Sequence, residues 1–473
     1  MVDGREIAAQ FEGAADFETR KVLCGGQLLT VLFLDGLTSG RDIAEQVLRP
    51  LAQMTDEARE EVLYTRALQG GVWCASVKEP ESTQQAAELL VNGFCVILFP
   101  KSGKALGCEV KTGEKRSPSP PETENTVKGA KDAFTETLRT NTSLVRRHLR
   151  TPGLRLTETV IGKRTLTKVT VCWIDRLTDP ELPRRMQERL SSIDIDGALS
   201  PAAIEEYVTG SRRTAFPLLE YTERTDHFCQ GLLDGQVGLL ADGLPLGYLA
   251  PVGLGRLMRS PEDRATDFFS ASILRLLRYA ALGVSLLLPA LYAAMAMFHQ
   301  QMLPTKLLLS IIESKQNVPF STLLEVLGLL CAFELLQQAG LHLPQAVGTA
   351  VSIIGGLVVG TAAVDAKLVS PAALIVTASS GICGFTLPNR ELSDAVRLWR
   401  FVLTVLAGLW GLFGVTVGLL LLLTELAGLE SLGRSYLSPF GRAEVKGALV
   451  RPRLVRQKWR DGALKPMDDQ NQR

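Results

Sequence analysis

Residues 352–372 read SIIGGLVVGTAAVDAKLVSPA, and this stretch decides the fold class of the C-terminal half of the chain. It carries no charge before Asp365, and Lys367 follows two positions later. An apolar segment rich in glycine is typical of a membrane helix, and a short charged interruption is typical of a turn between two such helices. Pro371 then falls in the first turn of the next helix, where its missing N–H group is harmless. The stretch therefore predicts two membrane helices joined by a short solvated turn.

The region beyond residue 268 contains four long apolar stretches, each close to the roughly 20 residues that cross the hydrocarbon core of a bilayer. They are residues 279–298, 346–364, 368–388 and 401–424. A fifth stretch, residues 318–344, is interrupted by Glu325 and Glu334, which are nine residues apart. At roughly 100° per residue, these two carboxylates point to opposite sides of a helix. Because a carboxylate that faces lipid is costly, at least one of them must meet protein, water or the membrane interface.

Basic residues predict the orientation of the membrane region. Three arginines precede the first span, and eight Lys and Arg residues lie within residues 434–460. By the positive-inside rule both ends are then cytoplasmic, which requires an even number of crossings. Four spans satisfy this if the Glu-bearing stretch is re-entrant, interfacial or packed inside the assembly. Arg390, Arg397 and Arg400 speak against this scheme, because it places their loop outside, and the number of crossings, four or five, stays open.

The first half of the chain reads as soluble protein. Residues 26–51 combine an apolar β-rich run, an Asp35-Gly36 turn and a helical spacing of apolar residues, and residues 93–111 read as two strands around a turn. We predict an α/β soluble N-terminal module of two subdomains followed by an α-helical polytopic transmembrane domain. The predicted parts are subdomain 1 (1–115), a linker rich in Pro, Ser and charge (116–127), subdomain 2 (128–268), the membrane domain (269–428) and a basic cytoplasmic tail (429–473).

The composition argues against several classes of function. The formal net charge is only +1, from 51 Lys and Arg against 50 Asp and Glu, which is not that of a strongly basic nucleic-acid binder. Eight cysteines without a CxxC pattern and only four histidines give no zinc-site spacing. No phosphate-binding loop, nucleophile elbow or zinc-protease motif is present either. The sequence therefore predicts neither an enzyme nor a cofactor. Nothing at the N-terminus resembles a cleavable signal peptide, so we expect the first domain to be cytoplasmic.

Small and hydroxyl side chains mark the stretch 346–364 and the turn after it. Such residues let helices approach closely, as in the GxxxG pattern, or they line a path for water or ions. Asp365 belongs either to a solvated turn or to a charged ring at the mouth of a pore in an oligomer. The candidate residues for a pore or for helix packing are Thr349, Ser352, Gly355, Gly356, Val359, Gly360, Thr361 and Asp365.

A second candidate is the basic helix predicted within residues 134–150. Its arginines are suited to phosphates or lipid headgroups, and the alternative is a solvated or salt-bridged face. The arginines are Arg139, Arg146, Arg147 and Arg150.

Several stretches in order resemble a known family. They are FTETLRTNTSLVRRHLR (134–150), GQVGLLADGLPLGYLAP (235–251), the glycine-rich residues 352–372 and RLWRF (397–401). Because these stretches occur in this order, nearly the whole chain resembles the A subunit of bacterial spore germinant receptors, the GerA family. The resemblance implies an integral protein of the spore inner membrane with a two-part cytoplasmic N-terminal domain. It also implies a transporter-like B subunit and a lipoprotein C subunit as partners, and oligomerisation with ion conduction early in germination.

We therefore expect a non-enzymatic receptor subunit that oligomerises and transduces germinant binding into ion release. One alternative is a membrane-anchored scaffold of the receptor complex without its own pore. Another is a secondary transporter for a small solute, which predicts internal repeats in the spans, and the sequence shows none. Membrane lipid is an expected partner, and nucleic acid is not.

Overall fold

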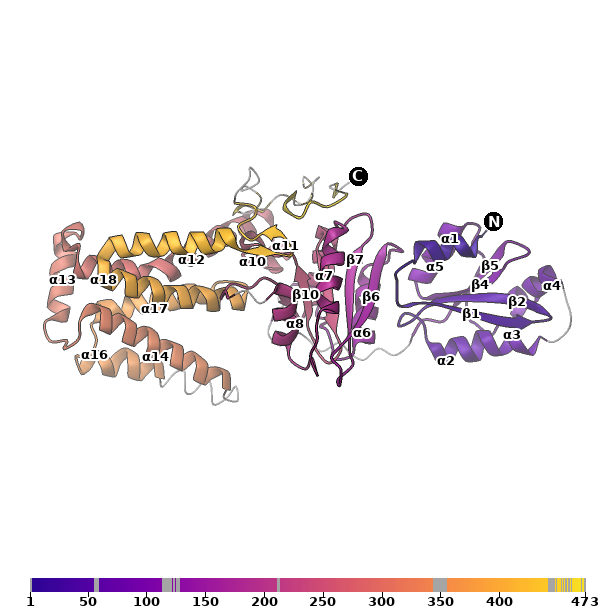
Figure 1. Ribbon diagram of the computed structural model, residues 1–473, viewed down its shortest axis with the longest axis horizontal. Helices are drawn as coiled ribbons and strands as arrows, with labels where there is room; N and C mark the ends of the chain where they lie inside the picture. The colour runs from indigo at the N-terminus through magenta and orange to yellow at the C-terminus, as the bar shows by residue number, and fades with distance from the viewer. Residues whose placement is uncertain are drawn as a thin grey trace. The chain divides into compact units, whose positions relative to one another are not determined.

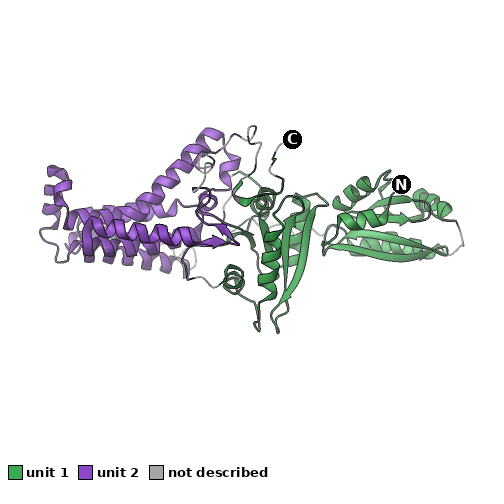
Figure 2. Cartoon of the chain, turned by 45° about the horizontal axis from the view of Figure 1, so that its top comes forward, with its two compact units in different colours: residues 1–212, 219–251, 455–473 green, residues 213–218, 252–454 purple. Residues whose placement is uncertain are grey.

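The structure is a computed structural model of residues 1–473. It describes the whole chain except residues 1, 55–58, 113–120, 122–123, 125–127, 211–212, 343–354, 441–446, 448, 452, 454, 456, 458–459, 461, 469 and 472–473. The chain divides into two compact units, which are described separately (Figure 2). Unit 1 comprises Met1–Arg212, Leu219–Pro251 and Val455–Arg473, and unit 2 comprises Arg213–Leu218 and Val252–Leu454.

The first sheet of unit 1 has the strand order β1-β2-β4-β5-β3, and all neighbouring strands are antiparallel. Its strands are β1 (Phe17–Cys24), β2 (Gln27–Leu34), β3 (Val77–Lys78), β4 (Phe94–Phe99) and β5 (Lys104–Glu109). Its helices are α1 (Gly4–Gln10), α2 (Gly40–Asp42), η1 (Ile43–Leu48), α3 (Arg49–Gln53), α4 (Glu60–Arg66), η2 (Ala67–Gly71) and α5 (Thr83–Val91). Helices α1 and α5 cover one face of the sheet, and α2 and α3 cover the other (Figure 1).

The central strand β4 explains this layered arrangement. Its sequence FCVILF is a continuous apolar run, and all six residues are buried. Because side chains alternate between the two faces of a strand, a run without polar residues requires cover on both faces. Ile97 packs with Val47 of η1 on one face, whereas Val96 packs with Leu90 of α5 on the other.

The second sheet of unit 1 has the order β6-β7-β9-β10-β8 and is also antiparallel throughout. Its strands are β6 (Leu154–Ile161), β7 (Thr167–Ile174), β8 (Glu220–Thr222), β9 (Val237–Ala241) and β10 (Gly247–Ala250). Its helices are α6 (Leu138–His148), α7 (Glu181–Ser191), α8 (Pro201–Thr209) and α9 (Thr225–Asp234). Val145 of α6 and Phe228 of α9 share one core with Leu240 of β9. The Phe228 ring lies directly on Gly238, where a Cβ atom would collide with it, so this sheet needs glycine at that position.

Unit 2 is mostly helical. Its helices are α10 (Leu254–Leu257), α11 (Glu262–Ala265), α12 (Phe268–Met297), η3 (Gln300–Met302), α13 (Thr305–Lys315), α14 (Thr322–His342), η4 (Val358–Ala362), α16 (Ala363–Asp365), α17 (Pro371–Phe385) and α18 (Arg390–Gly428), followed by the short strands β11 (Glu430–Ser431) and β12 (Arg434–Ser435). By length and composition α12, α14 and α18 can each cross a membrane, and residues 355–365 and α17 form shorter apolar helices.

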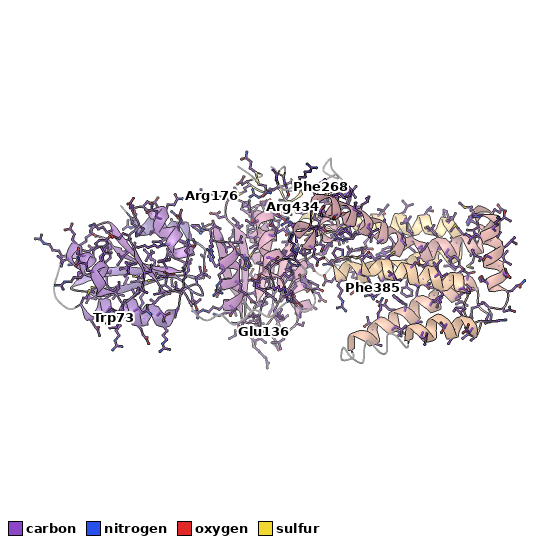
Figure 3. All side chains as sticks on the ribbon, turned by 180° about the vertical axis from the view of Figure 1, so that it is seen from behind. Trp73, Glu136, Arg176, Phe268, Phe385 and Arg434 are labelled. Carbon is purple, nitrogen blue, oxygen red and sulfur yellow. The ribbon has the colours of Figure 1, made fainter. Side chains whose placement is uncertain are left out.

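Large apolar side chains lie on the outside of these helices. Leu335 of α14 is 71% exposed. Phe385, which is labelled in Figure 3 at the end of α17, is 66% exposed. Exposed apolar surface of this kind, on the long helix α14 and on the shorter apolar helix α17, is what lipid contact requires. The predicted fold class, an α/β module of two subdomains followed by a helical membrane domain, is confirmed, with antiparallel sheets in the module.

Helix α18 reverses direction, which corrects the sequence prediction of one span at residues 401–424. Gly411 has φ +63° and ψ −141°, a backbone conformation that only glycine adopts without strain. A Cβ atom on Gly414 would collide with the Leu406 carbonyl, and one on Gly418 would lie 2.5 Å from the Leu403 side chain. Residues this far apart cannot touch along one straight helix. Residues 390–410 and 412–428 therefore form a helical hairpin, and hydropathy, which carries no directional information, cannot detect the reversal.

Candidate functional site

Unit 1 contains a cavity of about 600 Å³ between the loop after β2 and helix α6. Its lining combines three arginines with five threonines and two serines. The lining residues are Gly36, Thr38, Ser39, Gly40, Arg41, Thr112, Thr135, Thr137, Arg139, Thr140, Ser143, Leu144 and Arg147.

Hydrogen bonds fix the two walls of this cavity. Ser143 donates its hydroxyl to the carbonyl oxygen of Gly36 at 2.8 Å. Gly36 adopts a positive φ of 86°, as the predicted Asp35-Gly36 turn requires, and a Cβ atom there would lie 3.3 Å from the Ser143 Cβ. At the start of α6, the Asn141 side chain accepts from the Thr135 backbone N–H at 2.8 Å and donates to the Thr135 carbonyl at 2.6 Å. The polar groups that face the cavity are therefore held in place by the backbone.

The four arginines of the predicted basic helix divide into two groups. Arg146 is fully buried and donates from Nε and Nη2 to the two carboxylate oxygens of Asp16 at 2.7 and 2.8 Å. Arg139 pairs with Asp35 and lines the cavity, as does Arg147, whereas the Nε of Arg150 donates to the Arg147 carbonyl at 3.2 Å. Arg146 therefore forms a buried ion pair, whereas Arg139 and Arg147, together with Arg41, bring positive charge to the cavity.

The helix of residues 355–365 carries the described part of the predicted small-residue stripe. Thr349 and Ser352 lie outside the described residues, as does the side chain of Val359. The side chain of Leu336 of α14 packs directly on Gly355.

The rest of this stripe is open. Among the described residues, apart from the adjoining residues and backbone of the same helix, no atom lies within 4 Å of a Cβ built on Gly356 or on Gly360. Thr361 and Asp365 are exposed. Small residues allow a second helix to approach closely, and here the described part of the chain does not provide one.

Both predicted intramembrane carboxylates have protein partners on neighbouring elements. Glu325, which is 2% exposed, accepts a hydrogen bond from the backbone N–H of Ser370 and lies 3.9 Å from Lys315 Nζ. Glu334 Oε1 accepts from Arg397 Nη1 at 2.9 Å. Both carboxylates therefore meet protein, which is one of the three environments expected for at least one of them.

Arg397 and Arg400 lie in a helix, which corrects the expectation that they belong to a loop. Asn389 caps the N-terminus of α18 by accepting from Leu392 N at 2.8 Å, so the helix begins before both arginines. Arg400 is 0% exposed, and its Nη1 donates to the Ser380 hydroxyl at 3.1 Å. Sequence reasoning missed Arg400 as a core residue because an arginine in an apolar segment usually marks its end.

A family model described as Bacillus/Clostridium GerA spore germination protein matches residues 5–466, which is nearly the whole chain. The chain belongs to this family. The GerA-family chain is 36% identical over 445 residues to uncharacterized membrane protein YfkQ of Bacillus subtilis (strain 168), with 93% of this chain and 86% of that relative covered. It is 34% identical over 456 residues to spore germination protein KA of the same organism, with 94% and 83% covered.

A crystal structure of the N-terminal domain of the A subunit of the Bacillus megaterium spore germinant receptor GerK3 aligns with 52% of this chain and 92% of that domain, at 24% identity and a TM-score of 0.41. The family match confirms the predicted resemblance to germinant-receptor A subunits. The GerA-family chain is thus a membrane protein of the spore germination class, and the two relatives are named as a membrane protein and a spore germination protein.

The two parts of this GerA-family protein offer different chemistry. Guanidinium and hydroxyl groups around a cavity of this size are suited to a small molecule that carries a carboxylate or phosphate. Among the described residues, no group of three or more His, Cys, Asp or Glu side chains could hold a metal ion. Paired charges and an open small-residue face inside apolar helices are suited to helix contacts and to the passage of ions.

Proposed function

We propose that this GerA-family chain is the A-type subunit of a nutrient germinant receptor in the spore inner membrane, where it forms oligomers and converts germinant binding into ion release. The observation that carries the proposal is the open face of Gly356, Gly360 and Thr361 on a short helix flanked by apolar helices. In an oligomer, this face is available to a second copy of the chain and to an ion path that the copies surround.

The proposal includes an arrangement of partners and compartments. The N-terminal module and the C-terminal tail are cytoplasmic, and the chain works with a transporter-like B subunit, a lipoprotein C subunit and membrane lipid, and without nucleic acid. The cationic cavity of unit 1 is the proposed position for a germinant that carries a carboxylate. A germinant opens the path only if it binds the open state of the receptor more tightly than the closed state.

The ion path is tested by placing leucine at Gly356. We expect Gly356→Leu to block germinant-triggered ion release from spores and ion flux in liposomes, because the larger side chain fills the face that copies of the chain share. The matched control is Gly283→Leu in α12, since Gly283 likewise has no described atom within 4 Å of a built Cβ. Normal ion flux and normal assembly of Gly356→Leu would contradict the proposal.

The cavity is tested by removing its charge. We expect Arg147→Gln to raise the germinant concentration for half-maximal response by about tenfold or more, because it removes a charge-assisted hydrogen bond. Arg150→Gln is the control, since Arg150 lies two residues beyond the end of α6 and does not line the cavity. Equal responses of the two variants would place the germinant elsewhere, on a partner subunit.

Two other functions remain as alternatives to be separated by these measurements. A scaffold without its own pore predicts that the purified oligomer passes no ions in liposomes with any ligand. A secondary transporter predicts accumulation of a solute, and it requires internal repeats that the sequence does not contain.

A further inference from the structure

Helix α14 and the first part of α18 pack in a defined antiparallel register. Leu323 packs on Gly408, where a Cβ atom would collide with its side chain, and Glu334 bonds Arg397 at 2.9 Å. From Leu323 to Glu334 is eleven residues forward (334 − 323), and from Gly408 to Arg397 is eleven residues back (408 − 397). Both contacts therefore belong to the same alignment of the two helices.

In this alignment the polar partners are distributed unevenly between two arginines. Arg397 contacts Glu334, Gln337 and Asp394. Arg400 lies three residues further on and is fully buried, but the one hydrogen bond of its guanidinium group to a described residue goes to the Ser380 hydroxyl.

Unsatisfied atoms remain in the same cluster. Nε and Nη2 of Arg400 have no hydrogen-bond partner among the described residues, and neither has Oε2 of Glu334. The ionisable groups that act on Arg400 electrostatically are Glu334 and Arg397. Burying a guanidinium group without a carboxylate partner is costly. A rearrangement that brings a carboxylate to Arg400 would therefore lower this cost.

We propose that Glu334 exchanges between Arg397 and Arg400, so that α14 has two stable positions along α18. A shift of three residues corresponds to about 4.5 Å along the helix axis. In the shifted position Glu334 pairs with Arg400, and Gln337, three residues from Glu334 on the same helix face, replaces it at Arg397. Both positions keep hydrogen bonds to Arg397, and two discrete positions of packed helices form a bistable element.

The exchange reaches the proposed ion path through Glu325. This residue lies on the same helix, α14, and accepts from the backbone N–H of Ser370 at the start of α17. Ser370 follows Asp365, the end of the helix with the open small-residue face, by five residues (370 − 365). A shift of α14 therefore moves or breaks the contact at the turn between that helix and α17. In this respect the inference rests on the proposed function, whereas the positions of the helices are measurable without it.

A disulfide between Leu323→Cys and Gly408→Cys reports the observed position. The background is the full-length chain in membranes with Cys331 and Cys383 replaced by alanine, and the measurement is the rate of cross-linking after addition of a mild oxidant. We expect Arg397→Gln to lower this rate by about tenfold or more, because Glu334 can then form a charge-assisted hydrogen bond only with Arg400, in the shifted position. Arg400→Gln leaves the rate unchanged, because it removes only the partner that Glu334 has in the shifted position. A rate in Arg397→Gln equal to that of the background overturns the proposal.

A second variant adds a charge instead of removing one. It tests the proposal even if the Arg397→Gln chain does not insert into the membrane. Gln337→Glu supplies a carboxylate for each arginine only in the shifted position, so we again expect the cross-linking rate to fall by about tenfold. The matched control is Gln338→Glu, which places the same charge on the next, exposed residue and leaves the rate unchanged. Equal rates in the two variants overturn the proposal.

Ion release separates this inference from the proposed function. With both correct, Gln337→Glu raises ion release without germinant and Arg400→Gln abolishes the response to germinant. Cross-linking that changes as expected in a chain that passes no ions supports the exchange and contradicts the proposed function. Ion release that responds to germinant while cross-linking is the same in all variants contradicts the exchange alone.

Discussion

His148 and Asp132 form a pair in unit 1 that makes its stability depend on pH. Their side chains lie 2.7 Å apart; this hydrogen bond raises the pKa of His148 above its usual 6.5 and lowers the pKa of Asp132 to about 2. The contribution of His148 is full below about pH 6.5 and is lost as the pH rises through its raised pKa. The contribution of Asp132 is present above about pH 4 and is lost as the pH falls toward 2. The pair is therefore most stabilising between about pH 4 and 6.5.

We expect the melting temperature of unit 1 to fall when the pH is raised from 5.5 to 8, and the fall to be smaller in His148→Gln. Thermal denaturation of the full chain in detergent, followed at both pH values, measures this difference. Asp132→Asn removes the other partner and is expected to flatten the profile in the same way. A wild-type profile that is flat over this range would show that the pair contributes nothing to stability.

The basic helix shows how far single residues can be predicted. The sequence indicates four arginines near one another and offers a salt-bridged face as one interpretation. It does not indicate which arginine is buried, because the partner of Arg146 is Asp16, 130 residues earlier in the chain. The same limit applies to the cavity, whose walls meet where Ser143 bonds Gly36 across 107 residues. Local patterns predict the helix and the turn, and only the tertiary fold brings them together.

At the scale of elements, the reversal within α18 depends on one glycine. A Cβ atom on Gly411 would lie 2.7 Å from His299 and 3.0 Å from Phe298, in a backbone conformation unfavourable for any other residue. We expect Gly411→Ala to destabilise unit 2 by about 1–3 kcal/mol. The measurement is the melting temperature of the helical signal in detergent. The control is Gly283→Ala in the middle of α12, where an added Cβ atom has open space. It is expected to be neutral or slightly stabilising, because alanine favours a helix more than glycine does. An equal effect of both substitutions would show that the reversal tolerates a side chain.

Elements were predictable where composition alone determines them. The continuous apolar run of β4 and the long apolar stretch of α12 both indicate an element that is removed from water. The position of Arg397 was not predictable in this way, because its carboxylate partner Glu334 lies 63 residues earlier. Without its partner, a charged residue next to an apolar segment is interpreted as part of a loop. Once its carboxylate partner on another helix is known, the same residue is understood as a contact between the two helices.

At the scale of the whole molecule, the last residues of the chain belong to unit 1 although they follow unit 2 in sequence. Arg460 donates from Nε to the Leu233 carbonyl at 3.0 Å, and the backbone N–H of Met467 donates to the Leu177 carbonyl at 2.8 Å. The basic tail was predicted from charge and the positive-inside rule, which concern the membrane surface. Hydrogen bonds to backbone carbonyls carry no sequence signature, so this attachment could not be predicted.

Deletion of residues 455–473 tests this attachment. The exposed Arg176 precedes Leu177, whose carbonyl accepts from the tail (Figure 3). A backbone that loses one hydrogen bond opens more often, and a net hydrogen bond of about 1 kcal/mol corresponds to roughly fivefold in the open population. We therefore expect trypsin to cleave after Arg176 about fivefold faster in the truncated chain. Cleavage after Arg164, whose side chain is 82% exposed, is the internal control and should keep its rate. If both sites keep their rates, the tail does not protect this edge of unit 1 in solution.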